Sequence, residues 1–429
     1  MLAPTSETAS DQQCGQRFRS PFVRFFAPSV LVLLSACLIF LLVLGLWEAH
    51  AHRRVLNTIP VRIHVNGTRG KSSVTRLLSG ALREAGLVTC AKTTGTLARF
   101  ITPAGREYPI YRPAGANVGE QVRIVRTAAG YKPDVLVIEC MALQPSYQWM
   151  SEKMFVRATH GIITNARPDH LDVMGPEPED VALALSGMVP RGGKLFTCER
   201  EHAGIMQMAC DDRGSKFVPT TEADVAAVTP EELAPFPYQE HAENVALVLT
   251  VCADLNISRE TALRGMYTSP PDVGVLKEYQ INYFGRRLFF VNAFAANDPV
   301  STGRIWEGAV AKRPGVMRIA LFNCRDDRPD RSFGLGEACL DWTVADLYLL
   351  IGSGTHAFSR AAMKHGLDSE KIHYADGKNA SQIFETMLSV CGASALIVGM
   401  GNIGGPGLEL LQMVKNRCAP EQDPTAAIL

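Results

Sequence analysis

The sequence predicts an α/β protein with an N-terminal transmembrane helix, a larger α/β domain built on a parallel sheet, and a smaller, Rossmann-like C-terminal α/β domain. Three observations support this prediction. An uncharged segment lies near the N-terminus, short β-branched runs alternate with helical patterns beyond it, and a proline-rich break interrupts that alternation once. Strands alternating with helices are typical of parallel sheets covered by helices on both faces. We therefore expect three parts, at residues 1–54, 55–272 and 273–429.

The composition fits this fold and excludes several other classes of protein. The 429 residues include 43 Lys and Arg, 43 Asp and Glu, and 47% apolar residues, so the net charge is zero. A broad basic face for nucleic acid is not indicated, and a disordered or collagen-like chain is excluded. The eleven cysteines include no C-x-x-C pair, which indicates reduced, cytosolic thiols rather than a disulfide framework or a zinc site.

The predicted transmembrane helix is the segment 25–47, whose 23 residues carry no charge. At ~1.5 Å per residue, this segment is long enough to cross the hydrocarbon core of a bilayer. A cleaved signal peptide is the alternative. However, the apolar run is longer than that of most signals, and residues 46–50 make a poor small-residue cleavage site. Basic residues flank both ends, so the flanking charges leave the orientation of the helix open.

The larger α/β part begins with a strand, a glycine-rich loop and a helix. The β-branched run 61–65 leads directly into the loop 66–73, and apolar residues then recur at helical spacing from Val74 to a helix end near Gly86. The pattern breaks at 268–272, which predicts a linker. Further strands are expected before that linker at 134–140, 161–165 and 194–197, and after it at 287–291, 318–322, 347–351 and 395–398.

The glycine-rich loop is the strongest chemical signal in the chain. Its pattern is G-x-x-G-K-S, with Gly67 two residues closer to the lysine than in the usual G-x-x-x-x-G-K-[ST]. Glycines let backbone N–H groups wrap phosphate oxygens, and the helix that follows adds its positive dipole end. Lys71 can reach the β- and γ-phosphates, and the Ser72 hydroxyl can ligate Mg²⁺. A glycine turn with a solvated lysine is the alternative, but the flanking strand and helix favour nucleotide binding.

A second group of polar residues follows other predicted strands of the same sheet. Glu139 closes a buried strand, and the run 165–172 places two acids, an imidazole and an amide after the next one. Ligands of open α/β sheets gather at the carboxyl ends of the strands. The alternative interpretation is a helix cap at Glu139 and a turn in which Asp169 caps a helix. With a phosphate loop in the same sheet, the pattern favours a second Mg²⁺ site.

These residues resemble the motifs of the Mur-ligase superfamily of ATP-dependent amide ligases. The resemblance is carried by the loop 67–73, the strand end at Glu139 and the run 165–172. His241 and Asn244 are similar to the family's H-x-x-N motif on the adenine side of the nucleotide. Altogether the resemblance covers about residues 60–405.

The C-terminal part resembles the same family with two departures, and the central part shows a third. Residues 292–299 are similar to its D-x-Y-A-H-N-P segment, although Asn292 and Ala296 stand where the family has Asp and His. Residues 323–328 resemble an arginine-bearing loop. The third departure is in the central part, where Leu185 occupies the position at which related ligases carry a carbamylated lysine.

Further features narrow the resemblance within the superfamily. Only about six residues separate Arg54 from the first strand, which argues against the UDP-sugar domain of murein-precursor ligases. The membrane span and the loop sequence G-T-R-G-K-S-S look most like those of the ligase subunits of poly-γ-glutamate synthases, the PgsB/CapB family. A folylpolyglutamate synthetase-like γ-glutamyl ligase with an added anchor is one alternative. A non-catalytic nucleotide-binding assembly subunit, suggested by Leu185, is another.

The resemblance implies an ATP-dependent acid–amino-acid ligase that adds glutamate to a growing poly-γ-glutamate chain through an acyl phosphate, with ATP and Mg²⁺ as cofactors. It implies small membrane subunits as partners and no nucleic acid, and the use of ATP places the catalytic domains on the cytoplasmic side. The implied catalytic residues are Lys71, His170 and Arg325, to which we add Asp298 as the acid nearest to the missing family Asp. The implied metal ligands are Ser72, Glu139 and His170. The implied ATP-binding residues are Gly67, Thr68, Arg69, Gly70, Lys71, Ser72, Ser73 and Asn244.

Two remaining features bear on ligands. Residues 399–404 match G-x-G-x-x-G, but no further strand with an acid follows, so we expect a terminal glycine loop rather than an NAD site. Residues 55–274 carry 22 basic and 24 acidic side chains, which argues against a broad basic surface for a polyanionic product. Contact with such a product should therefore be local.

Overall fold

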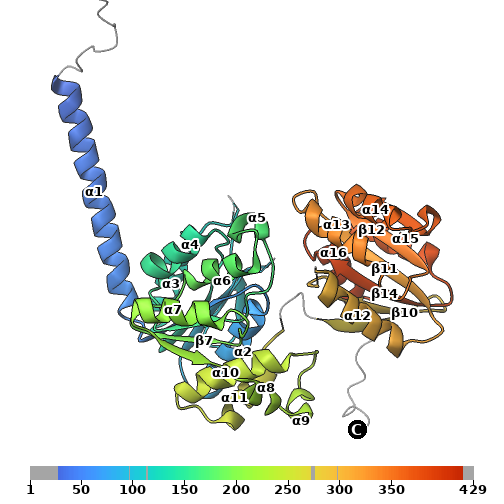
Figure 1. The fold of residues 1–429 in the computed structure, drawn as a ribbon, viewed down its shortest axis with the longest axis horizontal. Helices are drawn as coiled ribbons and strands as arrows, with labels where there is room; N and C mark the ends of the chain where they lie inside the picture. The colour runs from blue at the N-terminus through green and yellow to red at the C-terminus, as the bar shows by residue number, and fades with distance from the viewer. Residues whose placement is uncertain (1–27, 96, 113–114, 272–275, 297, 419–429) are drawn as a thin grey trace, which may run out of the picture. The chain divides into compact units, whose positions relative to one another are not determined.

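The computed structural model describes residues 28–95, 97–112, 115–271, 276–296 and 298–418 (Figure 1). The chain divides into two compact units, Met1–Arg54 and Val55–Leu429, and each is described by itself. The predicted boundary between residues 272 and 273 falls outside the described residues, so the three-part division stays a prediction.

The described part of the N-terminal unit is the helix α1, Pro28–Leu56, which continues two residues beyond the unit's end. Within it, the 25-residue stretch Val32–Leu56 contains an 18-residue window with a mean hydropathy of 2.4, and its apolar side chains from Val32 to Trp47 are exposed. The helix is therefore long and apolar enough to cross a membrane. Residues 25–27 of the predicted span lie outside the described residues.

The first sheet of the second unit has eight strands in the order β4-β3-β2-β5-β1-β6-β7-β8. All neighbours pair in parallel except near one edge, where β3 pairs antiparallel with both β2 and β4. The four strands predicted before the linker are confirmed to within two residues. The strands are β1 (Val61–Asn66), β2 (Thr89–Thr93), β3 (Arg99–Ile101), β4 (Glu107–Pro109), β5 (Val135–Glu139), β6 (His160–Ile163), β7 (Lys194–Thr197) and β8 (Lys216–Pro219).

Helices cover both faces of this sheet because successive strand residues point to opposite sides. Val135 and Val137 of β5 pack against α2 (Lys71–Glu84), α10 (Ala242–Asp254) and α11 (Arg259–Tyr267). Leu136 and Ile138 of the same strand pack against α3 (Glu120–Ala129) on the other face. The remaining helices are α4 (Pro145–Met150), the π-helix η1 (Ser151–Val156), α5 (Leu171–Met174), α6 (Pro178–Ser186), α7 (Ala203–Arg213), α8 (Glu222–Ala226) and α9 (Pro230–Leu233).

The second sheet has six strands in the order β13-β12-β11-β14-β10-β9, parallel except for the edge strand β9. All four strands predicted after the linker are confirmed, as β10, β11, β12 and β14. The strands are β9 (Lys277–Tyr283), β10 (Arg286–Asn292), β11 (Met317–Cys324), β12 (Leu347–Gly352), β13 (Ile372–Asp376) and β14 (Ser394–Gly401).

The second sheet is also covered on both faces, as the sequence predicts. Trp306, Leu335 and Phe358 come from α12 (Pro299–Lys312), α13 (Pro329–Ala338) and α14 (Thr355–Lys364) and pack on one face. Ile383 and Leu410 come from α15 (Ala380–Val390) and α16 (Pro406–Lys415) and pack on the other, while the short helix η2 (Ser369–Lys371) precedes β13. Figure 1 shows these helices around the sheet that contains β10, β11, β12 and β14.

Candidate functional site

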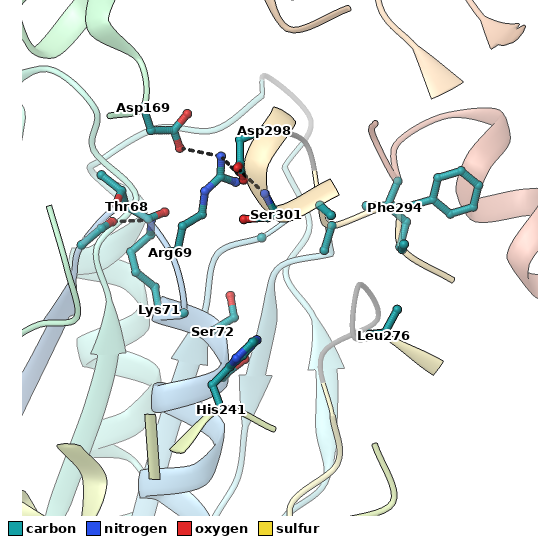
Figure 2. A pocket seen from close by; sticks show the side chains of 18 of the residues that line it. Thr68, Arg69, Lys71, Ser72, Asp169, His241, Leu276, Phe294, Asp298 and Ser301 are labelled. Atoms are coloured by element: carbon teal, nitrogen blue, oxygen red, sulfur yellow. Dashed lines mark hydrogen bonds and ion pairs between the residues drawn. The ribbon is translucent and has the colours of Figure 1, made fainter. Parts of the chain in front are cut away.

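Loops that follow strands of both sheets line a cavity of about 1530 Å³ (Figure 2). All of the site residues predicted from the sequence lie in its lining, so the structure brings them together. Ten Lys and Arg side chains and six Asp and Glu side chains line the cavity, an excess of four positive charges in a chain whose net charge is zero. Such a local excess attracts anionic ligands.

The phosphate loop between β1 and α2 depends on its two glycines. Gly67 has a φ of 129° and Gly70 a φ of 81°, conformations that other residues rarely adopt. A Cβ atom at Gly67 would lie 2.0 Å from Oγ1 of Thr164, and one at Gly70 would lie 2.8 Å from Oδ1 of Asn244. The backbone of the loop therefore curls closely against the end of β6 and the start of α10.

Asn165 fixes the loop from the carboxyl end of β6. Its Oδ1 accepts hydrogen bonds from the Thr68 hydroxyl at 2.7 Å and from the Arg69 backbone N–H at 3.1 Å. The Thr164 hydroxyl donates to the Arg69 carbonyl at 2.5 Å. The sequence places Asn165 in the polar run after the strand but does not predict this bracing role.

Lys71 is the first residue of α2 and points back into the curl of the loop. Its ammonium donates to the carbonyls of Gly67 at 2.6 Å and Thr68 at 3.2 Å. An ammonium has three donors, so one remains after these two bonds. Burial lowers the pKa of Lys71, and the nearby carboxylates of Glu139 and Asp169 offset part of that shift.

Ser72 and Glu139 form an oxygen-rich pair beside the loop. The Ser72 hydroxyl donates to Oε2 of Glu139 at 2.9 Å, and the backbone and hydroxyl of Thr94 donate to the same carboxylate at 2.8 and 2.6 Å. Mg²⁺ prefers such oxygen ligands and binds through one or two of them together with phosphate oxygens and water. The pair thus fits one Mg²⁺. Sequence reasoning missed Thr94, and the short T-T-G run was the available signal.

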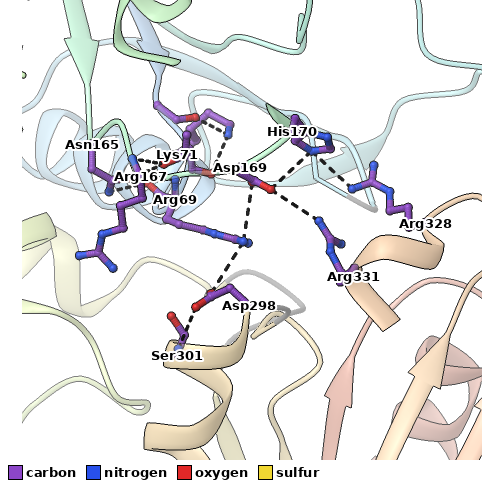
Figure 3. Close-up of polar contacts among 12 residues, drawn as sticks. Arg69, Lys71, Asn165, Arg167, Asp169, His170, Asp298, Ser301, Arg328 and Arg331 are labelled. Carbon is purple, nitrogen blue, oxygen red and sulfur yellow. Dashed lines mark hydrogen bonds and ion pairs between the residues drawn. The ribbon is translucent and has the colours of Figure 1, made fainter. Parts of the chain in front are cut away.

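Asp169 and His170 lie at the start of α5, close to arginines from other elements (Figure 3). Asp169 forms ion pairs with Arg69 at 3.7 Å and with Arg331 at 3.8 Å. Nε2 of His170 lies 3.4 Å from Nη1 of Arg328. Burial lowers the pKa of His170, Asp169 offsets part of this shift, and the two neighbouring arginines lower the pKa further.

The predicted C-terminal residues have different surroundings from one another. Asp298 caps α12 by accepting a hydrogen bond from the Ser301 N–H at 2.8 Å, and its other oxygen lies 3.8 Å from Nη2 of Arg69. Arg325 makes a two-pronged pair with the neighbouring Asp327, at 2.8 and 2.6 Å.

The arginines that extend toward Asp169 and His170 are Arg331 and Arg328. Sequence reasoning passed over Arg331 and did not single out Arg328. Their spacing with Arg325, R-x-x-R-x-x-R, was the available signal.

Two further predicted positions also lie in the cavity wall. The Asn244 side chain lies against Gly70 and donates to Oε1 of Glu240 at 2.8 Å. Leu185 belongs to an apolar cluster with Met174 and Val181. The adenine contact implied for Asn244 stays a prediction.

Two protein-family models match the chain. Residues 65–191 match the Mur ligase middle domain, and residues 278–417 match the C-terminal domain of poly-gamma-glutamate synthase CapB. The first match contains the phosphate loop, Glu139 and His170, and the second contains the arginine-bearing segment.

Curated relatives are similar over most of the chain. The capsule biosynthesis protein CapB of Bacillus anthracis is 36% identical over 388 residues, which cover 90% of this chain and 83% of that protein. The PGA synthase CapB of Bacillus subtilis (strain 168) is also 36% identical over 388 residues, covering 89% of this chain and 97% of the relative.

Solved structures share the fold of the body at low sequence identity. E. coli FolC in complex with DHPP and ADP has a TM-score of 0.59 and 15% identity, covering 86% of this chain and 92% of the other. A bifunctional folylpolyglutamate synthase/dihydrofolate synthase with Mn, AMPPNP and L-glutamate bound has a TM-score of 0.57 and 14% identity, with the same coverage. These similarities establish the fold.

Proposed function

Because the chain belongs to the CapB family of poly-γ-glutamate synthases, within the Mur-ligase superfamily, we propose that it is an ATP-dependent ligase that adds glutamate to a growing poly-γ-glutamate chain. The observation that carries the proposal is the cavity, in which Lys71 and the Ser72–Glu139 pair lie beside an excess of cationic side chains. A phosphate loop and a cationic site for carboxylates are the two elements that activation of an acid by ATP requires.

The proposed reaction has two steps in the same cavity. A carboxylate oxygen of the acceptor chain attacks the γ-phosphorus of ATP, the bond to the bridging oxygen breaks, and ADP leaves with that electron pair. The amine of glutamate then attacks the carbonyl carbon of the acyl phosphate, loses a proton, and expels inorganic phosphate. The products are an amide, ADP and phosphate, so atoms and charge balance.

The residues of the phosphate loop have separate roles in this proposal. Lys71 and the loop N–H groups hold and orient the γ-phosphoryl group while negative charge shifts during transfer. Ser72 and Glu139 would hold Mg²⁺, which neutralises charge on the phosphates when bound. Thr94 keeps the Glu139 carboxylate oriented through its two hydrogen bonds.

The remaining predicted residues enter the proposal with the roles that the family resemblance implies. Asn244 contacts the nucleotide base, His170 positions the acceptor carboxylate, and Arg325 completes the site. Asp298 keeps Arg69 directed into the cavity from 3.8 Å. Closure of such a site excludes water, which would otherwise hydrolyse an acyl phosphate.

We include the membrane in the proposal because α1 has the length and hydropathy of a spanning helix. ATP is a cytoplasmic substrate, so the catalytic part lies on that side and works with small membrane subunits. We assign the anchor to residues 1–54, the ATP-binding domain to 55–272 and the C-terminal ligase domain to 273–429.

A folate-directed activity is the nearest alternative, and sequence similarity argues against it. The CapB relatives are 36% identical to the chain over 388 residues, whereas FolC is 15% identical. We therefore expect glutamate to be added to a γ-glutamyl acceptor and not to a folate.

Phosphate release from ATP by membranes that contain the full chain and its partner subunits tests the proposed function. We expect release that requires glutamate and a γ-glutamyl acceptor, and a decrease of about 100- to 1,000-fold for Lys71→Ala because a charged donor to the transferred group is lost. Lys364→Ala, at the exposed end of α14, is the matched control. A Lys71→Ala rate equal to that of the wild type would refute the ligase assignment.

A further inference from the structure

Three arginines from two segments surround Asp169 and His170 in the cavity. Arg69 comes from the phosphate loop, whereas Arg328 and Arg331 come from the start of α13 (Figure 3). The ion pairs of Asp169 with Arg69 and Arg331 are 3.7 and 3.8 Å long, beyond hydrogen-bond distance. One carboxylate is thus shared by two guanidinium groups at long range, and their N–H donors can turn to a closer anion.

Arg331 is held in place by a network that reaches across the second sheet. Its Nη1 donates to Oδ1 of Asn402 at 2.8 Å, and Nδ2 of Asn402 donates to the Asn323 carbonyl at 3.2 Å. Asn323 in turn donates to the Gly404 carbonyl at 2.8 Å. A Cβ atom at Gly407 would lie 2.6 Å from Nδ2 of Asn323, so the glycine-rich loop after β14 is shaped for this network.

The position of Arg331 is electrostatically unfavourable without an anion. Its side chain is only 15% exposed, and burial together with the charge of Arg328 lowers the pKa of its guanidinium to about 10. A prearranged cation with such a shift gains stability when a carboxylate or phosphate joins it.

The same region does not fit the second Mg²⁺ that the resemblance implies. Leu185, at the position of the carbamylated lysine, is buried among apolar side chains, and Nε2 of His170 faces the Arg328 guanidinium. Among the described residues, no group of three or more His, Cys, Asp or Glu side chains could hold a metal ion. Mg²⁺ needs oxygen ligands, and an adjacent guanidinium repels it.

The chemistry of the ligands identifies which anion suits the arginines. The phosphate loop already supplies Lys71 and backbone donors for phosphate, so a second anion is needed to explain the remaining charge. Incoming glutamate brings an ammonium group that the cluster repels, whereas the acceptor end of a γ-linked chain carries two carboxylates and no nearby ammonium. Guanidinium groups bind planar carboxylates in a two-pronged manner.

We propose that Arg69, Arg328 and Arg331 bind the terminal carboxylates of the poly-γ-glutamate acceptor, and that these arginines supply the positive charge that a second Mg²⁺ at His170 would otherwise provide. The proposal deepens the proposed function and rests on it for the identity of the acceptor. It also explains how a body that carries slightly more acidic than basic residues engages a polyanion: the contact is confined to this cluster.

Equilibrium binding of a penta-γ-glutamate probe to the detergent-solubilised full chain, with AMPPNP present, tests the cluster directly. We expect Arg331→Met to weaken probe binding at least tenfold, and Arg331→Lys to weaken it less because the charge remains while the two-pronged geometry is lost. AMPPNP binding should change less than twofold in both. Arg328→Gln, on another half-buried side chain of the cluster, provides a second variant if Arg331→Met does not fold.

Two controls separate this proposal from the proposed function. Lys71→Ala should abolish phosphate release yet retain probe binding, whereas Arg318→Gln, which removes a surface pair with Asp346, should change neither. Unchanged probe binding by a folded Arg331→Met or Arg328→Gln variant would overturn the cluster. If probe binding depends on Arg331 but the protein shows no glutamate-dependent phosphate release, the ligase function is contradicted. The anion site is still supported by that result.

The number of bound Mn²⁺ ions per chain, counted in the presence of AMPPNP, tests the claim about the metal. We expect one ion, retained in His170→Ala and lost in Glu139→Gln. Two ions per chain, with one of them lost in His170→Ala, would show that the second metal is present and would overturn the substitution by arginine.

Discussion

The phosphate-loop side of the cavity and its arginine-bearing side position their charges by different means. On the loop side, Thr68 and Arg69 are fixed by hydrogen bonds to Asn165 at the end of the neighbouring strand, and Lys71 bonds to the loop's own carbonyls. On the other side, Arg331 depends on Asn402, which lies 71 residues further along the chain. On the loop side the positive-φ backbone of Gly67 and Gly70 sets the path of the chain and Asn165 braces it, whereas Arg331 is held through the side chain of Asn402.

This difference predicts separate sensitivities for the two sides. The loop should be sensitive to a change of its backbone path as well as to the loss of Lys71, because its phosphate donors are main-chain N–H groups together with the Lys71 ammonium. The arginine side should tolerate backbone changes in α13 better than the loss of a single guanidinium or of its supporting amide. Substitutions on each side therefore test whether the two sides of the cavity respond differently.

The largest effect is expected from Gly67→Ala on the loop side. The added methyl would lie 2.0 Å from the Thr164 hydroxyl at a φ of 129°, so the loop must leave its path and its donors lose their alignment. We expect glutamate-dependent phosphate release to fall by about 1,000-fold, with weaker AMPPNP binding, because several phosphate donors move together.

Gly86→Ala is the matched control for that prediction. Gly86 also has a positive φ, 82°, but no atom lies within 4 Å of a Cβ built there, and it follows the other end of α2. This variant should lose some stability and keep its AMPPNP affinity. An equal loss of affinity in both variants would mean that general strain, and not the loop's path, controls nucleotide binding.

A buried ion pair beneath the loop should make the stability of the β1 side depend on pH. Nδ1 of His64 lies 2.8 Å from Oε2 of Glu152, and both side chains are buried. Burial lowers the pKa of His64, but its contacts with Cys140 and Glu152 outweigh burial and raise the pKa to about 9. A raised folded-state pKa stabilises the protein fully below the unfolded value of about 6.5, and this stabilisation is lost as pH rises through about 9.

Glu152→Gln should therefore destabilise the body most at low pH. We expect a loss of about 3 kcal/mol in the free energy of unfolding at pH 6, shrinking toward pH 9.5, as measured by denaturant unfolding of the full chain in detergent. Glu260→Gln, which removes an exposed pair with Arg264, should show no such pH dependence. A Glu152→Gln deficit that stays constant from pH 6 to 9.5 would exclude the charged pair.

The same contrast explains what could be predicted from the sequence. Strands with apolar runs, such as β5 and β14, could be predicted, and so could the phosphate loop, because each is a pattern in consecutive residues. β2 was missed because it carries Lys92, a fully buried lysine whose charge is balanced by Glu120 at 3.1 Å, a partner that only the folded chain supplies. The short strands β3 and β4 have three residues each, too few for a recognisable alternation.

The residues of the candidate site also divide into those that the sequence predicts and those that depend on tertiary contacts. Lys71, Ser72 and Glu139 follow from motif and strand-end reasoning, and the structure brings them to one cavity. Arg331 does not follow from such reasoning, because its importance comes from Asp169 and Asn402, which are distant in sequence. Arg325 matched the family loop but is paired with its neighbour Asp327. Similar residues in one short segment thus acquire different surroundings through tertiary contacts.

The smallest effect, and the sharpest test of the comparison, is expected from Asn402→Ala. This change removes the Oδ1 acceptor that holds Arg331 and the Nδ2 donor to Asn323, while the guanidinium itself remains. We expect penta-γ-glutamate binding to weaken three- to tenfold, in the range of the net contribution of one ordinary hydrogen bond, with AMPPNP affinity unchanged. Asn379→Ala is the matched control, since Asn379 caps α15, a helix that packs on the same sheet, and its loss lowers stability without touching the arginines.

If Asn402→Ala weakened AMPPNP binding as much as acceptor binding, the two sides would act as one rigid site. An effect on the acceptor alone would establish that phosphate and carboxylate recognition are built independently and meet only at Arg69, the one arginine of the cluster that the phosphate loop supplies.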